Sequence, residues 1–120
     1  MTLYKKTIGK FGEDLACDFL KKRGYRILER NVKISYQEID IVSSLKNRLV
    51  FVEVKTRSSD NLGGAEDALF PKQIKNLKKA IAAYCHQRQK KLFSISLDFV
   101  AIDLNRINKT AKIKHYKNIF

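Results

Sequence analysis

Apolar side chains recur at helical spacing near the start of the chain. Between residues 12 and 23 they fall three or four positions apart, which predicts an amphipathic helix that ends at Gly24. The apolar face consists of Phe11, Leu15, Ala16, Phe19 and Leu20. Glu13 lies on the edge of that face, in the stripe that Ala16 and Leu20 continue. The helix therefore carries a carboxylate toward whatever its apolar face covers.

Three runs rich in branched and aromatic residues follow, and they predict strands at residues 25–32, 35–45 and 48–57. Lys46 and Asn47 predict a two-residue turn between the last two of these strands. Residues 58–64 are polar and contain Gly63 and Gly64, which is typical of a mobile loop.

A second helix is predicted from Pro71, a residue that suits the first helical turn. On a helical wheel, one side gathers the apolar residues Ile74, Leu77, Ile81, Tyr84 and Cys85, and the opposite side gathers Lys72, Lys75, Lys79, His86 and Lys90. Two further strands are predicted at residues 95–104 and 111–116. The order αβββαββ predicts an α/β (α+β) fold in which one mixed five-stranded sheet carries the helices.

The length of 120 residues fits one domain. Hydrophobic residues make up 44% and charged residues 31%, which is typical of an ordered globular protein and excludes a disordered one. No apolar run is long enough for a signal peptide or a membrane span, so we expect a cytoplasmic protein without a membrane partner. Cys17 and Cys85 lack metal-ligand spacing, and their apolar helical surroundings predict buried thiols in a reducing compartment.

The charge balance makes nucleic acid a candidate partner. Twenty-five Lys and Arg residues against twelve Asp and Glu residues give a net charge of +13, and such an excess attracts polyanions. Lys72, Lys75 and Lys79, with Arg57 nearby in sequence, could follow a phosphate backbone without reading base sequence. The alternative is a solvated basic surface, or a partner on acidic lipid or an acidic protein.

Charged residues stand at alternate positions in the second and third predicted strands. Residues two apart share one face of a strand, so Glu38 and Asp40 lie on the same face of the second strand, and Glu53 and Lys55 lie on the same face of the third. With a two-residue turn at 46–47, Asp40 lies opposite Glu53 and Glu38 lies opposite Lys55, all on one face. A three-residue turn would put the two pairs on opposite faces.

With the two-residue turn, three carboxylates and one ammonium group share an otherwise apolar surface. Facing carboxylates repel, and a bound cation relieves that repulsion. Their oxygens suit Mg²⁺ or Mn²⁺, which could activate a water for attack on a phosphate. Lys55 could hold that water or stabilise the phosphoryl charge, and Glu13 could orient a metal-bound water. The alternative is a solvent-exposed face with a Glu38–Lys55 ion pair.

Several other residues are candidates with a plainer alternative. Asp98 either helps the site or pairs with a basic neighbour, and His115 is predicted to be structural. Tyr4, Tyr36 and Phe120 could stack on nucleobases, with ordinary packing as the alternative.

Short motifs spread along the chain carry a family resemblance. They are Gly12-Glu13 with Ala16, Gly24-Tyr25-Arg26-Ile27-Leu28 with Arg30-Asn31, Glu38-Ile39-Asp40-Ile41-Val42, Val50-Phe51-Val52-Glu53-Val54-Lys55-Thr56-Arg57, Leu62-Gly63, Lys72-Gln73, Asp98-Phe99-Val100 and Ile119-Phe120. On these residues the chain resembles the bacterial YraN-type family from about residue 9 to the C-terminus. That family is similar to the PD-(D/E)xK nucleases, which have restriction-endonuclease-like and Holliday-junction-resolvase-like folds.

The resemblance implies a restriction-endonuclease-like core and a role for each residue of the site. Asp40 and Glu53 would bind the metal, Lys55 would be catalytic, and Glu13 would be an acid supplied by the helix. Gln73 matches a position where several relatives carry a glutamine or lysine of the site.

Two positions depart from the pattern of the resemblance. Ile39 replaces the proline of the PD signature, and Gln37 stands where the family has glycine. Neither change removes a metal ligand.

The function that the resemblance implies is a divalent-metal-dependent endonuclease that acts on DNA rather than RNA. Structured or branched DNA is suggested by the resolvase likeness alone, and it would require a symmetric homodimer. A non-catalytic nucleic-acid-binding module on the same fold and a protein-interaction domain are the alternatives.

Overall fold

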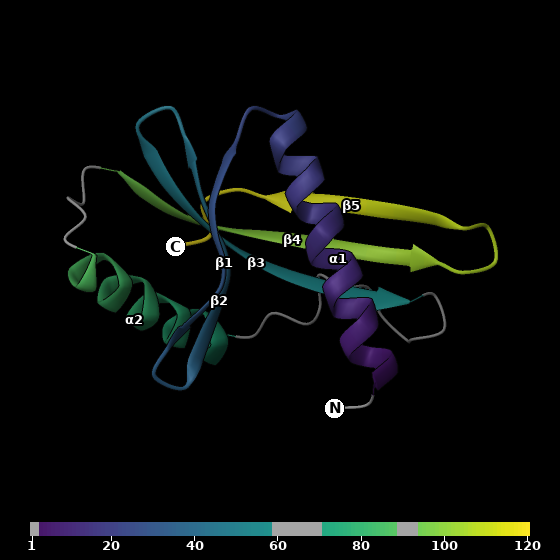
Figure 1. Cartoon of the computed structure of the whole chain (residues 1–120), viewed down its shortest axis with the longest axis horizontal. Coiled ribbons are helices and arrows are strands. Elements are labelled where there is room, and N and C mark those ends of the chain that lie inside the picture. Colours follow the sequence, from purple (N-terminus) through teal and green to yellow (C-terminus); the bar gives the residue numbers. More distant parts are fainter. Residues whose placement is uncertain (1–2, 59–70, 89–93) are drawn as a thin grey trace.

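A computed structural model of the chain describes residues 3–58, 71–88 and 94–120 (Figure 1). Its elements are α1 (Leu3–Lys22), β1 (Arg26–Ile34), β2 (Gln37–Leu45), β3 (Arg48–Ser58), α2 (Pro71–Gln87), β4 (Ile95–Asn105) and β5 (Thr110–Tyr116). The predicted order αβββαββ is confirmed. The predicted mobile loop lies outside the described residues, except for Ser58, which belongs to β3.

The five strands form one mixed sheet in the order β1-β2-β3-β4-β5. The pairs β1–β2, β2–β3 and β4–β5 are antiparallel, whereas β3 and β4 are parallel. A parallel neighbour needs a crossover connection, and α2 lies in the connection between β3 and β4. The predicted mixed sheet carrying two helices is confirmed.

Helix α1 is longer than predicted, because it begins at Leu3 rather than at Gly12. Its C-terminal end follows the prediction, and Gly24 adopts a φ of +90°. The backbone N–H of Tyr25 donates to the Leu20 carbonyl and that of Gly24 donates to Lys21, both at 3.0 Å. This is the Schellman arrangement, in which glycine accepts a left-handed backbone at low cost.

The two helices cover opposite faces of the sheet. Residues of β3 alternate between them: Val50, Val52 and Val54 pack in the cluster under α1, whereas Phe51 packs in the cluster under α2. In Figure 1, α1 crosses in front of the β3–β5 part of the sheet, and α2 lies beside the β1–β2 hairpin. The predicted apolar face of α1 is wrong at one position, because Phe11 is 53% exposed.

The turn between β2 and β3 contains two residues, as predicted. Leu45 pairs with Arg48, and between them Lys46 adopts a φ of +56°. Left-handed backbone in such a turn matches the twist of the strands that it joins. The predicted register is therefore present from Leu45–Arg48 to Ile41–Val52.

A buried polar group fastens the C-terminal segment to the sheet. The Asp98 carboxylate lies 2.7 Å from His115 Nε2, and it accepts hydrogen bonds from Ser96 Oγ and from the Asn118 backbone N–H. Burial works to raise the pKa of Asp98, but the hydrogen bonds from His115, Asn118 and Ser96 outweigh it and lower that pKa. Of the two alternatives for Asp98, the structure shows pairing with a basic neighbour, and His115 has the predicted structural role.

Cys17 and Cys85 are both buried, as predicted, and neither forms a disulfide. Within the described ranges, no helix combines the length and the apolar content that crossing a membrane requires.

Candidate active site

Strands β2 and β3 stop pairing at Asp40, and we call this point the fork. The ladder runs from Leu45–Arg48 to Ile41–Val52 and ends there. Beyond this last pair, the Val54 backbone N–H donates to Asp40 Oδ2 at 2.8 Å. A carboxylate thus satisfies a backbone donor that no longer has a ladder partner.

Beyond the fork, β2 continues to pair with β1 only. Glu38 is the ladder partner of Lys33 in β1. The prediction that Glu38 lies opposite Lys55 in the β2–β3 ladder is therefore wrong, because that ladder ends before it reaches them. In Figure 1, β1 and β2 run across the direction of β3, β4 and β5, which shows how far the two parts of the sheet diverge.

Asp40 and Glu53 interact at the fork. Glu53 is 7% exposed, and its carboxylate hydrogen bonds with the Asp40 side chain. Burial, followed by this hydrogen bond and the charge of Glu53, raises the pKa of Asp40 far above its usual range. The Val54 N–H and the charge of Lys55 oppose this rise, which places Lys55 close to the same carboxyl group. Without a cation, the protonated form of Asp40 is therefore favoured more strongly than in an exposed aspartate.

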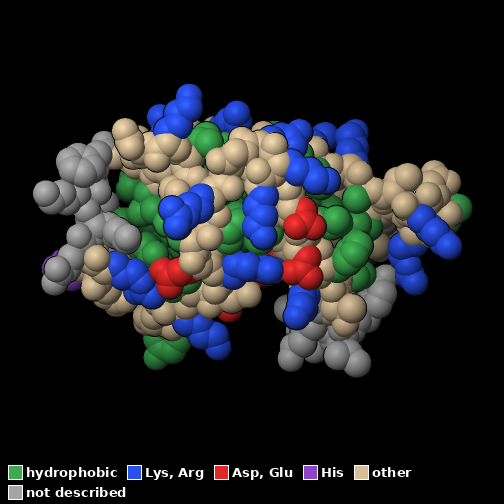
Figure 2. Space-filling view, turned by 45° about the horizontal axis from the view of Figure 1, so that its top comes forward, with side chains coloured by type: hydrophobic (Ala, Val, Ile, Leu, Met, Phe, Trp, Pro, Cys, Tyr) green, Lys and Arg blue, Asp and Glu red, His purple; other side chains and the backbone are tan. Residues whose placement is uncertain are grey.

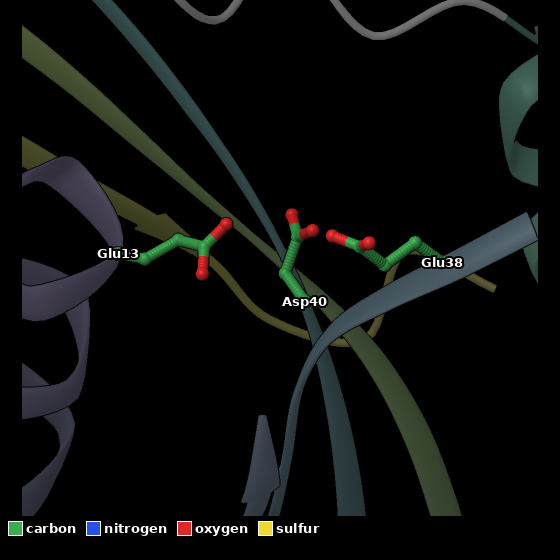
Figure 3. A group of neighbouring side chains, drawn as sticks. All are labelled: Glu13, Glu38 and Asp40. Carbon is green, nitrogen blue, oxygen red and sulfur yellow. The ribbon is translucent and has the colours of Figure 1, made fainter. Parts of the chain in front are cut away.

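Two further carboxylates reach Asp40 from different elements. Glu13 comes from α1 and Glu38 from the start of β2, and ligand oxygens of Glu13, Glu38 and Asp40 lie within 4.8 Å of one another. Figure 3 shows the three side chains pointing toward one another where β2 crosses the sheet. Burial, then the charge of Asp40, raises the pKa of Glu13 to about 7. We call Glu13, Glu38, Asp40, Glu53 and Lys55 the fork site.

Two residues of β1 hold Glu13, and reasoning from the pattern alone did not assign them to the site. Arg30 Nη2 lies 3.8 Å from Glu13 and 2.8 Å from Asp14. Asn31 hydrogen bonds with Glu13, and it adopts a φ of +53° in the middle of a strand. Asparagine tolerates this left-handed backbone better than most residues. The only sequence signal was the Arg30-Asn31 pair within the family resemblance.

Helix α1 comes very close to β3 beside Glu13. A Cβ atom added to Gly12 would lie 1.8 Å from Thr56 Oγ1, so only glycine fits at this contact. Thr56 Oγ1 is buried and has no hydrogen-bond partner among the described residues. The close approach brings the backbone of α1 near enough for Glu13 to reach the fork.

The fork site fits a hard divalent cation. Carboxylate oxygens are the ligands that Mg²⁺ and Mn²⁺ prefer. Burial and the neighbouring carboxylates raise the pKa values of Glu13 and Asp40, even though Arg30 and Lys55 oppose the rise. A cation would replace the protons that otherwise relieve this repulsion. The structure groups Glu13 and Glu38 with Asp40 as candidate ligands, whereas the sequence suggested Asp40 and Glu53.

The basic residues predicted to contact nucleic acid lie on β3 and α2. Lys72, Lys75 and Lys79 are exposed on α2, and Arg57 is half-buried near the end of β3. Figure 2 shows Lys and Arg side chains spread over one face of the molecule, with Asp and Glu as small patches among them. Gln73 is half-buried in the first turn of α2, and its role in the site stays a prediction. Lys90 lies outside the described residues.

The raised pKa of Glu13 predicts a pH-dependent effect of Glu13→Gln on stability. The folded-state pKa is about 7 against an ordinary 4.5, so the folded state binds more protons than the unfolded state between these pH values. Stability is therefore lost as pH rises through this range, and the glutamine variant escapes the loss. In EDTA, we expect Glu13→Gln to unfold at higher urea than the parent at pH 8, but not at pH 4.5. A difference that stays constant with pH would contradict the assignment.

Comparison with known proteins gives consistent relatives along the chain. Residues 12–102, which include the whole fork site, match the family described as "Uncharacterised protein family UPF0102". A UPF0102 protein of Syntrophomonas wolfei is 42% identical over 115 residues, which cover 96% of this chain and 98% of the relative. One from Flavobacterium psychrophilum is 43% identical over 113 residues, covering 94% and 92%. One from Caldanaerobacter subterraneus is 42% identical over 118 residues, covering 97% and 96%.

Proposed function

The chain belongs to the uncharacterised protein family UPF0102, and from the geometry of its fork site we propose that it is a divalent-metal-dependent endonuclease that hydrolyses DNA phosphodiesters. One observation carries the proposal. Four carboxylates from α1, β2 and β3, together with Lys55, converge on one point of a protein whose net charge is +13.

The arrangement is costly unless it binds something positive. The chain has twelve acidic residues, and four of them gather at the fork against mutual repulsion. Arg30 forms ion pairs with Glu13 and Asp14, and the charge of Lys55 acts on Asp40, so the site combines its four carboxyl groups with two nearby cations. Clustered carboxyl groups with raised pKa values in such a place are a mark of functional sites.

Each residue of the fork site has a distinct task in the proposed reaction. Asp40, with Glu13 and Glu38 beside it, holds the cation, and Glu53 orients Asp40 through the hydrogen bond between their side chains and is a further candidate ligand. A bound Mg²⁺ or Mn²⁺ would acidify a water and neutralise charge on the phosphate. Lys55 donates to the attacking water or to the phosphoryl oxygens as negative charge develops there.

The basic surface supplies the affinity for DNA. Lys72, Lys75 and Lys79 face solvent along α2, and Arg57 lies further along the strand that carries Glu53 and Lys55. Contacts of this kind neutralise phosphates and position the backbone without reading sequence. The proposal takes DNA rather than RNA as the substrate, and a symmetric homodimer as the form that acts on branched substrates.

The rival is a module that binds nucleic acid without turnover, and the exposed lysines of α2 alone would account for it. A protein-interaction domain is the weaker rival. Linear duplex, flap and four-way-junction DNA, with RNA of the same sequence, should be incubated with the protein in Mg²⁺, Mn²⁺ or EDTA. Asp40→Asn is the test variant, because an amide oxygen can still accept the Val54 N–H. Asp18→Asn is the control, since Asp18 is an exposed acid on α1.

We expect metal-dependent cleavage by the parent and by Asp18→Asn, and none in EDTA or by Asp40→Asn. Cleavage by Asp40→Asn at the parent rate would contradict the assignment of the fork site as the active site. Salt-dependent binding with no cleavage in either metal would replace the endonuclease with the binding module. Absence of binding to any nucleic acid would leave the protein-interaction domain.

A further inference from the structure

The turn between β1 and β2 presents one aromatic side chain to solvent. β1 ends at Ile34 and β2 begins at Gln37, so the turn consists of Ser35 and Tyr36. Ser35 adopts a φ of +57°, and the Tyr36 side chain is 102% exposed. Ile34, directly before the turn, is buried in the core. Tyr36 therefore contributes nothing to packing, while its backbone is held by a short and anchored turn.

The tip of this hairpin lies beside the N-terminal half of α2. Where α2 meets β1, the Tyr84 hydroxyl donates to Glu29, and Arg88 forms an ion pair with the same carboxylate at 3.2 Å. These bonds fix the C-terminal end of α2 near the start of β1. Ile34, directly before the tip, belongs to the same core cluster as the buried face of α2, which includes Leu77. Figure 1 shows the hairpin tip next to the N-terminal end of α2.

Exposed lysines lie on both elements that meet near Tyr36, with the exposed Glu38 two residues beyond it in β2. Lys72 and Lys75 are exposed on the half of α2 that the tip adjoins, and Lys33 is exposed one residue before Ile34. An exposed aromatic next to lysines suits a nucleic acid strand, because phosphates meet the lysines while a base stacks on the ring. A hydrophobic or acidic protein surface would match only one of these two features.

Tyr36 also stands at a defined distance from the fork site. It precedes Glu38 by two residues and Asp40 by four along the same chain direction. At about 3.3 Å per strand residue, the backbone of Tyr36 is about 13 Å from that of Asp40 along the chain, or roughly four stacked base steps. A strand whose phosphate lies at the fork can therefore bring a base a few nucleotides away onto Tyr36.

We propose that Tyr36 is a stacking platform for an unpaired base of the DNA strand that enters the fork site, so that the substrate class is DNA with unpaired bases next to a duplex. This inference rests on the proposed function and names the substrate class of the same site. In a continuous duplex every base is already stacked on its neighbours, and moving one onto Tyr36 has an unstacking cost. A flap, bubble or junction offers such a base freely.

Binding in EDTA tests the proposal apart from cleavage. Labelled single-stranded DNA, a duplex of the same sequence and a flap carrying 2-aminopurine in the unpaired arm should be titrated with the parent, Tyr36→Ala and Tyr36→Phe. Loss of one stacking contact weakens binding about 5- to 150-fold. We expect this loss in Tyr36→Ala for single-stranded and flap DNA, less than about twofold change for the duplex, and recovery in Tyr36→Phe. The slope of affinity against salt should not change, because no phosphate contact is removed.

Ile107→Ala is the matched control, since Ile107 is 89% exposed on the turn between β4 and β5. It should bind all three DNAs as the parent does. Equal losses on duplex and single-stranded DNA, or no loss in Tyr36→Ala, would overturn the stacking role, and the exposed ring would then belong to a protein contact. If Tyr36→Ala weakens binding of single-stranded and flap DNA but the parent protein cleaves no DNA, the stacking role is supported and the proposed endonuclease activity is overturned.

Discussion

Lys55→Met is expected to slow DNA cleavage about 10²- to 10³-fold at saturating Mn²⁺, the loss typical of removing one preorganised group that stabilises developing charge. Lys55 lies close enough to the fork for its charge to lower the pKa of Asp40. Its removal also favours the protonated form of Asp40, so Mn²⁺ should bind more weakly at neutral pH and recover as pH rises. Single-turnover rates and Mn²⁺ titrations at two pH values separate the two effects.

The control for this variant is Lys112→Met, which removes an exposed lysine from β5. It should cleave at nearly the parent rate. If saturating Mn²⁺ at high pH restores full cleavage to Lys55→Met, then Lys55 acts only on metal binding, and its proposed role in the reaction is wrong.

Gly12→Ala is expected to destabilise the fold, although alanine normally stabilises a helix. The added methyl group would lie 1.8 Å from Thr56 Oγ1 and 2.8 Å from its Cβ, so α1 or β3 must shift. Overpacking of this kind costs about 1–3 kcal/mol, which exceeds the gain of about 1 kcal/mol that alanine gives over glycine in a helix. Urea unfolding measures the net sign.

Gly9→Ala is the control on the same helix, because nothing lies within 4 Å of a Cβ atom at that position. It should stabilise the protein by up to about 1 kcal/mol. Thr56→Ala removes the closest clashing atom, whose hydroxyl has no partner among the described residues, and should partly rescue Gly12→Ala. A stabilising Gly12→Ala would show that the helix and the sheet do not meet as described.

The elements near the turn at Lys46 and Asn47 could be predicted because local rules decide them. A two-residue turn fixes register, and the period of two then sets the faces, so Asp40 and Glu53 come together as predicted. The basic and apolar sides of α2 follow in the same way from the helical period. None of this needs knowledge of distant contacts.

The fork itself could not be predicted, because nothing in the composition of β2 or β3 marks where a ladder ends. The ladder stops after Ile41 and Val52, and a side chain of Asp40 replaces the next backbone acceptor. The positive φ of Asn31 is also invisible in a strand-like run. The first turns of α1 were missed because the stretch before Gly12 has no clear cap or apolar stripe, and Gly9 weakens the helical signal.

Contacts between distant segments account for the remaining differences. The Asp98–His115 pair exists only because β4 and β5 are neighbours, with Val100 opposite His115. Likewise, the reach of Glu13 to Asp40 depends on how closely α1 approaches Thr56. Sequence spacing within one element does not contain this information.

The two-residue hairpin turn has a consequence for insertions and deletions. The register of the hairpin from Ile41 to Val52 determines that Asp40 lies next to Glu53. A single-residue deletion between Ile41 and Leu45 would move Asp40 by one position and turn its carboxylate to the opposite face. Length variation in this hairpin should therefore be confined to the tip at Lys46 and Asn47, where the chain can bulge outward without shifting the strands.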